Sequence, residues 1–191
     1  MIAACARAAG AVAAVLALSG CAGLITAERL PAGEPFDILG RVLAIGEGRA
    51  FSSGFRWRHD ADADEIWLLS PTGQVLAHIA ATADEATLTA ADQQQYRALS
   101  AESLMQRALG WALPLDRLQH WVRGTVIPGR VVAAAVRDAP GRLSELEQDG
   151  WRIHYAYAEA PAGTQQPRRL DLIRGTQQIR LVIDEWRHNQ P

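Results

Sequence analysis

From residue 36 onward the hydrophobic residues fall into short runs separated by turn residues, a pattern typical of β-strands. The alternation is clearest over residues 51–58, where Phe51, Ser53, Phe55 and Trp57 fall on one face of a strand. We therefore expect strands at Phe36–Ile45, Phe51–Arg58, Glu65–Leu69, Gln74–Ala80, Glu85–Ala90, Gln95–Ala98, Arg130–Val136, Leu143–Gln148, Trp151–Tyr157, Arg169–Ile173 and Ile179–Trp186.

Two short helices are predicted between the sixth and seventh of these strands. Ser100 can cap a helix that ends near Leu109, since Glu102 lies in its first turn and Gly110 follows it. A second helix has Pro114 at its first position and ends at Gly124. The apolar stripes are Leu104, Met105, Ala108 and Leu109 in the first helix, and Leu115, Leu118 and Trp121 or Val122 in the second.

The order of these elements predicts the fold class. Every connection between strands is hairpin-like and no β-α-β crossover is present, so the sheet should be antiparallel. We expect a mainly β (α+β) domain, in which one large, strongly curved antiparallel sheet has the two helices packed against its concave side.

The first 20 residues predict a secretory signal peptide rather than part of a folded domain. Their apolar run carries a single charge, Arg7, and is short for a transmembrane helix. Leu18-Ser19-Gly20-Cys21 looks like the lipobox of bacterial lipoproteins, which would make Cys21 the lipidated N-terminus of the mature chain. The alternative is an ordinary signal peptide that happens to be cleaved near a cysteine.

The cysteine count supports lipidation. Cys5 lies in the predicted signal peptide, so Cys21 would be left alone in an oxidising compartment, with no partner for an internal disulfide. Residues 21–35 contain Pro31, Gly33 and Pro35 and show no clear period, which indicates a flexible tether. The folded domain is then expected to span residues 36–191.

Charge and motif content narrow the function classes. All 19 basic residues are arginine and the formal net charge is −2, so no nucleic-acid partner is indicated. The usual hydrolase, zinc and phosphate-binding motifs are missing, which leaves no candidate catalytic residue, metal site or cofactor. The five scattered histidines are expected at the surface or rim. Asp60, Asp62 and Asp64 indicate a solvated turn rather than a calcium loop, because Glu65 stands where such a loop requires glycine.

The apolar content is large for a thin sheet. Six tryptophans and 49% hydrophobic residues either fill one ordinary core or line an apolar cavity that accepts acyl chains. Periodicity does not separate a filled interior from a hollow one, so both interpretations stay open at this point.

Several motifs, in order along the chain, resemble the LolB family of outer-membrane lipoprotein receptors. The most specific is Gly110-Trp111-Ala112-Leu113-Pro114-Leu115, followed by Leu118, Trp121 and Gly124. The others are Phe36-x-x-x-Gly40-Arg41-Val42, Phe55-x-Trp57, Ser70-Pro71-x-Gly73, Gly150-Trp151-x-Ile153-x-Tyr155, Pro167 and Ile179-x-Leu181-x-Ile183-x-x-Trp186. Together the matches span nearly the whole predicted domain.

The resemblance implies an open, incomplete β-barrel of the LolA/LolB type, capped by short helices around a hydrophobic cavity. Members of the family receive acylated lipoproteins from the periplasmic carrier LolA and release them into the outer membrane, without a nucleotide and without enzymatic activity. The resemblance also implies a monomer that is lipid-anchored in the inner leaflet of the outer membrane and faces the periplasm. By resemblance to the sorting rules of such lipoproteins, Ala22 rather than aspartate after Cys21 favours the outer membrane over retention in the inner membrane. The candidate cavity residues are Phe55, Trp57, Trp67, Leu104, Met105, Leu109, Leu118 and Trp121.

One position departs from the family. The turn after Pro71 commonly presents an exposed leucine that helps deliver cargo to the membrane, and here Thr72 stands at that position, before Gly73. We therefore expect that cargo acceptance is retained while delivery relies on another apolar element or is weaker. The rival interpretations are an anchored lipid or glycolipid carrier, or an envelope scaffold of the same fold, and, in a third class, an envelope hydrolase.

Overall fold

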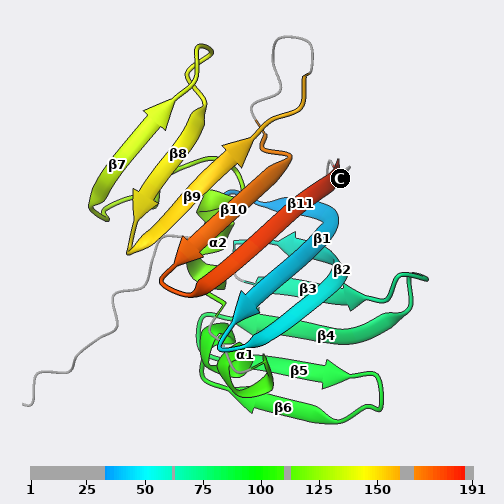
Figure 1. The fold of residues 1–191 in the computed structure, drawn as a ribbon. Coiled ribbons are helices and arrows are strands. Elements are labelled where there is room, and N and C mark those ends of the chain that lie inside the picture. Colours follow the sequence, from blue (N-terminus) through cyan, green and yellow to red (C-terminus); the bar gives the residue numbers. More distant parts are fainter. Residues whose placement is uncertain (1–32, 62, 110–112, 160–165, 188–191) are drawn as a thin grey trace, which may run out of the picture.

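The computed structural model describes residues 33–187 except residues 62, 110–112 and 160–165, so the signal peptide and Cys21 lie outside the described residues. Within them, eleven strands form one antiparallel sheet in the order β6-β5-β4-β3-β2-β1-β11-β10-β9-β8-β7 (Figure 1). The strands are β1 Phe36–Gly46, β2 Arg49–His59, β3 Ala63–Leu69, β4 Val75–Thr82, β5 Ala86–Ala90, β6 Gln95–Ala98, β7 Val132–Arg137, β8 Leu143–Gln148, β9 Trp151–Ala156, β10 Arg169–Arg174 and β11 Gln177–Arg187.

The sheet consists of two meanders that meet at its centre. Strands β1–β6 form one meander and β7–β11 the other, and β1 pairs with β11 so that Val42 lies opposite Leu181. Strands β6 and β7 are consecutive in the sequence but lie at opposite edges of the sheet. The segment between them therefore crosses the sheet, and it carries the helices α1 (Ala101–Leu109) and α2 (Leu115–Trp121). This confirms the predicted open antiparallel sheet with two short helices.

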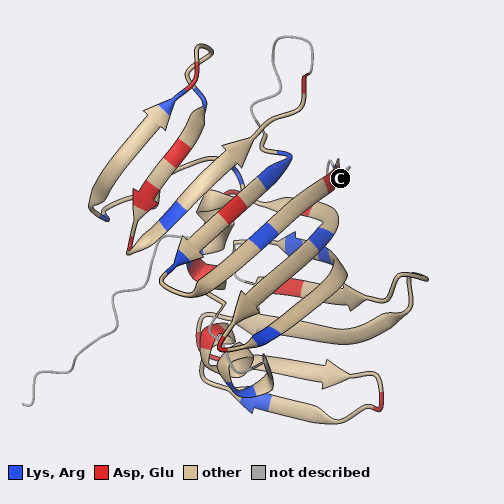
Figure 2. Cartoon of the chain, in the orientation of Figure 1, with Lys and Arg blue, Asp and Glu red and all other residues tan. Residues whose placement is uncertain are grey.

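The two faces of the sheet differ in polarity. In β1, Ile38, Val42 and Ala44 are buried on the face that joins the apolar core, whereas Leu39, Arg41 and Leu43 are more exposed. The opposite face carries cross-strand ion pairs, and Figure 2 shows positive and negative bands side by side on β8–β11 and β1. Examples are Arg41–Asp184 at 2.8 Å and Arg152–Glu147 at 3.8 Å. The sheet thus has one dry face and one solvated face, as antiparallel sheets commonly do.

Gly40 of β1 lets the backbone of β11 and the Phe55 ring pack closely against β1 at the centre of the sheet. A Cβ atom on Gly40 would lie 2.2 Å from the carbonyl oxygen of Val182 and 3.0 Å from two ring carbons of Phe55. The register of β1 against β11 shifts between Leu39 and Gly40, which marks a bulge at this point. The glycine leaves the space that the Phe55 ring occupies.

Both helices begin and end close to the predicted positions. The Ser100 hydroxyl accepts a hydrogen bond from the Ser103 backbone N–H at 3.1 Å, which confirms the predicted cap. The second helix begins at Leu115, one residue later than predicted, because Pro114 has the non-helical ψ of a cap residue. Gly124, with φ of +73°, follows its end.

Two predictions about polar residues were wrong. His59 and His120 are buried, with 3% and 6% of their surface exposed, although all histidines were expected at the surface or rim. Asp64 does not belong to a solvated turn but lies in β3, opposite His59. Its Oδ1 accepts a hydrogen bond from the Trp57 indole N–H at 2.7 Å and lies 2.8 Å from His59 Nδ1.

Candidate functional site

An apolar layer between the sheet and the two helices holds most of the residues predicted to contact acyl chains. We use the term apolar layer for six residues of one buried cluster, each with less than 5% of its surface exposed. They are Phe55 and Trp57 of β2, Leu104 and Met105 of α1, and Leu118 and Trp121 of α2. Strand alternation in β2 and helical spacing in α1 and α2 both direct these side chains inward.

Two of the predicted contact residues are not in this layer. Trp67 lies on the opposite face of the sheet, since it pairs across strands with Arg56 and His78 while Ile66 pairs with Trp57. Its indole stacks on the His78 ring at 5.0 Å between centroids, and the Arg56 guanidinium lies 5.4 Å from the indole centroid. The side chain of Leu109 lies outside the described part of the structure.

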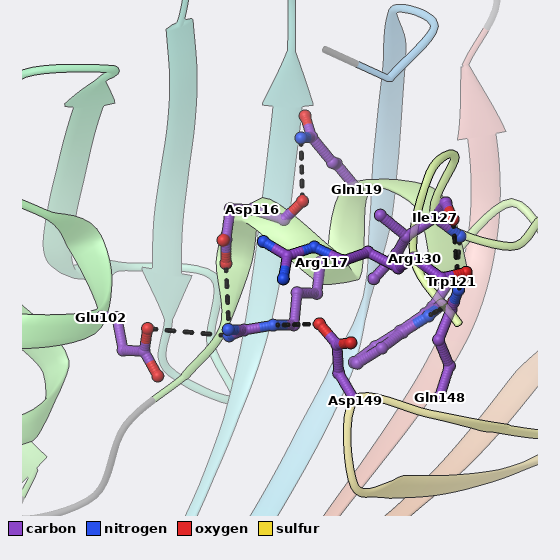
Figure 3. A network of polar contacts seen from close by, with 9 residues as sticks. All are labelled: Glu102, Asp116, Arg117, Gln119, Trp121, Ile127, Arg130, Gln148 and Asp149. Atoms are coloured by element: carbon purple, nitrogen blue, oxygen red, sulfur yellow. Dashed lines mark hydrogen bonds and ion pairs between the residues drawn. The ribbon is translucent and has the colours of Figure 1, made fainter. Parts of the chain in front are cut away.

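A buried amide fixes α2 over the layer. Gln148 of β8 is 1% exposed, and its Oε1 accepts hydrogen bonds from the Trp121 indole N–H at 3.1 Å and the Ile127 backbone N–H at 2.9 Å. Its Nε2 donates to the carbonyl oxygens of Ile127 at 3.1 Å and Arg130 at 3.4 Å (Figure 3). One side chain therefore orients Trp121 and holds the segment after α2 against β8.

Arg117 joins three elements beside this amide. Its Nε donates to Asp149 in the β8–β9 turn at 3.1 Å, and its Nη1 lies 3.7 Å from Glu102 of α1 and 3.8 Å from Asp116 (Figure 3). Burial alone lowers the pKa of Arg117, but Asp116, the hydrogen bond to Asp149 and Glu102 outweigh it, so its pKa is raised. The guanidinium stays charged and connects α1, α2 and the sheet.

The predicted membrane-delivery turn projects from the end of β3. Pro71, Thr72 and Gly73 are all exposed, and the Gly73 N–H donates to the Ser70 carbonyl oxygen at 2.9 Å, which closes a β-turn. The Ser70 and Thr72 hydroxyls lie 2.9 Å apart. Next to the turn, 50% of Val75 and 44% of Leu76 are exposed, so apolar surface is available there without a leucine at Thr72.

Sequence analysis missed the polar residues that hold the helices in place. Gln148 and Asp149 gave no signal because their partners are 18 or more positions away in the sequence. For Arg117 the sequence indicated its position on the helix but not its partners. The spacing of Leu115, Leu118 and Trp121 places it off the apolar stripe of α2.

The described residues show two further features that bear on function. No helix among them is long and apolar enough to cross a membrane. No group of three or more histidine, cysteine, aspartate or glutamate side chains within the described ranges is arranged to hold a metal ion. The described residues thus form an apolar interior beneath two helices, and side-chain contacts such as those of Arg117 and Gln148 hold these helices in place.

Comparison with known proteins agrees with this picture. A family model described as "Outer membrane lipoprotein LolB" matches residues 34–186. The Outer-membrane lipoprotein LolB of Nitrosomonas europaea is 39% identical over 157 residues, which cover 81% of this chain and 74% of that protein. The protein of the same name from Cupriavidus pinatubonensis is 36% identical over 185 residues, covering 88% and 89%.

One solved structure is also similar, a LolA superfamily protein from Nitrosomonas europaea, with a TM-score of 0.47, 8% identity and coverage of 85% of this chain and 90% of that one. The family match includes both helices and all eleven strands of the described structure, from just before β1 to the next-to-last residue of β11. The chain therefore belongs to the family of the outer-membrane lipoprotein LolB.

Proposed function

We propose that this protein accepts acylated lipoproteins from the periplasmic carrier LolA and inserts them into the outer membrane. The observation that carries the proposal is the LolB family match over residues 34–186, which includes the sheet and both helices. Relatives of the chain are named outer-membrane lipoproteins, which supports a lipid-anchored protein on the periplasmic side of that membrane. The role is one of binding and transfer, performed by a monomer without a cofactor or a catalytic residue.

The physical need for such a receptor follows from the cargo. Each CH₂ of an acyl chain exposed to water costs about 0.8 kcal/mol, so two or three chains cost roughly tens of kcal/mol. Cargo must therefore pass from one apolar interior to another. Phe55, Trp57, Leu104, Met105, Leu118 and Trp121 are the apolar surface that we assign to the chains.

Entry of the chains requires movement of the helices. The residues of the apolar layer are closed off from solvent, so an acyl chain enters only where packed groups separate. Breaking the sheet would disrupt ladders of backbone hydrogen bonds, whereas no backbone–backbone hydrogen bond among the described residues joins α1 or α2 to a strand. We infer that the helices, and not the strands, move aside for cargo.

Anchoring and delivery complete the proposal. Cys21 carries the lipid after removal of residues 1–20, and residues 21–32 connect it to the folded part of the chain. The turn of Pro71, Thr72 and Gly73, together with the neighbouring Val75 and Leu76, contacts the membrane during delivery. Exposure of these residues supports that contact.

A transfer assay tests the proposal. The mature lipidated protein is reconstituted in liposomes and mixed with LolA preloaded with a labelled triacylated lipoprotein, without ATP, and the label is followed into the liposomes. Leu118→Asn should lower transfer at least about tenfold, because it places an amide in the apolar layer. The same substitution at Leu99, which is 85% exposed, should leave transfer unchanged.

The outcomes separate the candidate functions. Transfer that is fast in the unmodified protein and lost only in Leu118→Asn supports the receptor function. If cargo stays on LolA while circular dichroism shows a folded protein, the receptor function is wrong. Binding of free fatty acids under those conditions would identify an anchored lipid carrier instead.

A further inference from the structure

Three residues at the end of the predicted tether are bound to α2 and β2. We call Gly33–Pro35 the strap. The Gly33 N–H donates to Oε1 of Gln119 in α2 at 3.3 Å, and the Gly33 carbonyl oxygen lies 3.3 Å from Nε2 of His59 in β2. The Arg123 guanidinium, just after α2, donates to the Pro35 carbonyl oxygen at 3.3 Å and pairs with the Glu34 carboxylate.

The strap is thus attached to both sides of the apolar layer. Gln119 and Arg123 belong to α2 and the residues that follow it, while Leu118 and Trp121 of the same segment lie in the apolar layer. His59 belongs to the sheet, where Asp64 contacts its other ring nitrogen at 2.8 Å. The strap therefore connects α2 to β2 at the point where the chain enters β1.

These contacts are of a kind that can form and break. Strap residues lie outside the strands, so no backbone ladder holds them. Glu34 is 78% exposed at its side chain, and water can satisfy the polar groups of the strap once they separate from α2. Breaking the strap contacts therefore exposes no large apolar surface.

We propose that the strap is a latch that holds α2 against the sheet, so that opening of the apolar layer and release of the strap are one event. This inference rests on the proposed function, because it concerns how the acyl site opens. Because the strap continues directly into β1, movement of α2 away from the sheet pulls Gln119 and Arg123 away from the strap until these contacts break. By linkage, cargo that displaces α2 favours a free strap, and a free strap favours cargo.

The latch also couples cargo to the lipid anchor. Release of the strap moves the first held residue from Gly33 to Phe36, three residues further from Cys21, which corresponds to about 10 Å of extra reach. A loaded domain is then held less tightly at its anchor than an empty one. The tether thereby takes part in the uptake cycle in addition to retaining the domain at the membrane.

A reversible cross-link tests the latch. A Cβ built on Gly33 lies 3.5 Å from the Cβ of Gln119, which is within the range for a disulfide. The double variant Gly33→Cys/Gln119→Cys is made in the full mature chain with Cys21→Ala, so that the two new cysteines are its only thiols. Uptake of a fluorescent dipalmitoylated cysteinyl peptide is measured with the disulfide formed and after reduction, beside each single-cysteine variant.

The latch predicts that the oxidised double variant takes up the peptide about tenfold less well than its reduced form. Reduction should restore uptake to at least the level of the Cys21→Ala chain, and the single-cysteine variants should not respond to the oxidant. Equal uptake by the oxidised and reduced forms would overturn the latch. Absence of uptake in the reduced form and in the Cys21→Ala chain would instead contradict the proposed function.

A second variant tests the latch without a cross-link. Arg123→Ala removes two strap contacts and leaves the apolar layer intact, so it should raise the uptake rate several-fold. The matched control is Arg49→Ala, which removes an exposed arginine at the start of β2, opposite the last residue of β1, and should leave the rate unchanged. An unchanged or lower rate in folded Arg123→Ala protein would contradict the latch.

Discussion

The indole N–H of Trp121 donates to Oε1 of Gln148 at 3.1 Å, in a place where both residues are buried. Gln148→Leu should lower the free energy of unfolding by about 1–3 kcal/mol, because it leaves the Trp121 and Ile127 N–H groups without an acceptor. Urea unfolding measures the change. The exposed Gln178→Leu is the control, and a similar small effect at both positions would show that the buried amide does not hold α2.

Arg117 and Asp149 should show measurable coupling because the side chains of both are mostly buried. A double-mutant cycle with Arg117→Ala and Asp149→Ala should give about 0.5–1 kcal/mol, which salt reduces. The same cycle at the more exposed Arg41–Asp184 pair should give a smaller value. Equal coupling energies at the two sites would contradict a special role for the Arg117 contacts.

Tryptophan emission can report which face of the sheet meets the acyl chain. A brominated acyl chain quenches nearby indoles, so Trp57→Phe should reduce the fraction of emission that is quenched. Trp67→Phe should increase that fraction, because Trp67 lies on the opposite face with Arg56 and His78. If Trp67→Phe reduces quenching instead, cargo binds to the outer face of the sheet.

The projecting turn should tolerate a larger apolar residue. Thr72→Leu adds exposed apolar surface beside Val75 and Leu76, so it should increase insertion of cargo into liposomes without changing uptake from LolA. Stability should stay within about 0.5 kcal/mol, because the position is exposed. Thr72→Ser is the control for loss of the methyl group. Unchanged insertion by Thr72→Leu would argue against a role for this position.

Two neighbouring tyrosines should respond differently to loss of their hydroxyl groups. The Tyr155 hydroxyl is buried without a hydrogen-bond partner among the described residues, whereas the Tyr157 hydroxyl donates to the Leu143 carbonyl oxygen at 2.7 Å. Tyr155→Phe should be neutral or stabilising, and Tyr157→Phe should lower the free energy of unfolding by about 1 kcal/mol. Thermal unfolding of both variants measures the contrast. The reverse order would mean that the Tyr155 hydroxyl has a partner in solution.

Much of the fold was predictable because its signals are local. Alternation placed Ser53, Phe55 and Trp57 on one face of β2, and the structure buries all three. Ser100 caps α1 as its side-chain chemistry predicts. Hairpin-like connections were sufficient to predict an antiparallel sheet.

The face of Trp67 and the role of the strap were not predictable from local patterns. In β3, Ile66, Trp67 and Leu68 are consecutive apolar residues, so alternation does not say which face is buried. Only the pairing of Trp67 with Arg56 decides it. Gly33 lies in a segment that resembles a linker, and its partner Gln119 is 86 positions later.

The pairing of β1 with β11 has a consequence for how the protein is made. A chain exported from its N-terminus delivers residues 36–46 early and residues 177–187 last, yet these two segments form the middle of the sheet. Until the last strand emerges, β1 presents a bare edge that can pair with a foreign chain. A polypeptide cut short before Gln177 leaves two half-sheets without a centre, and quality-control proteases of the envelope should degrade it.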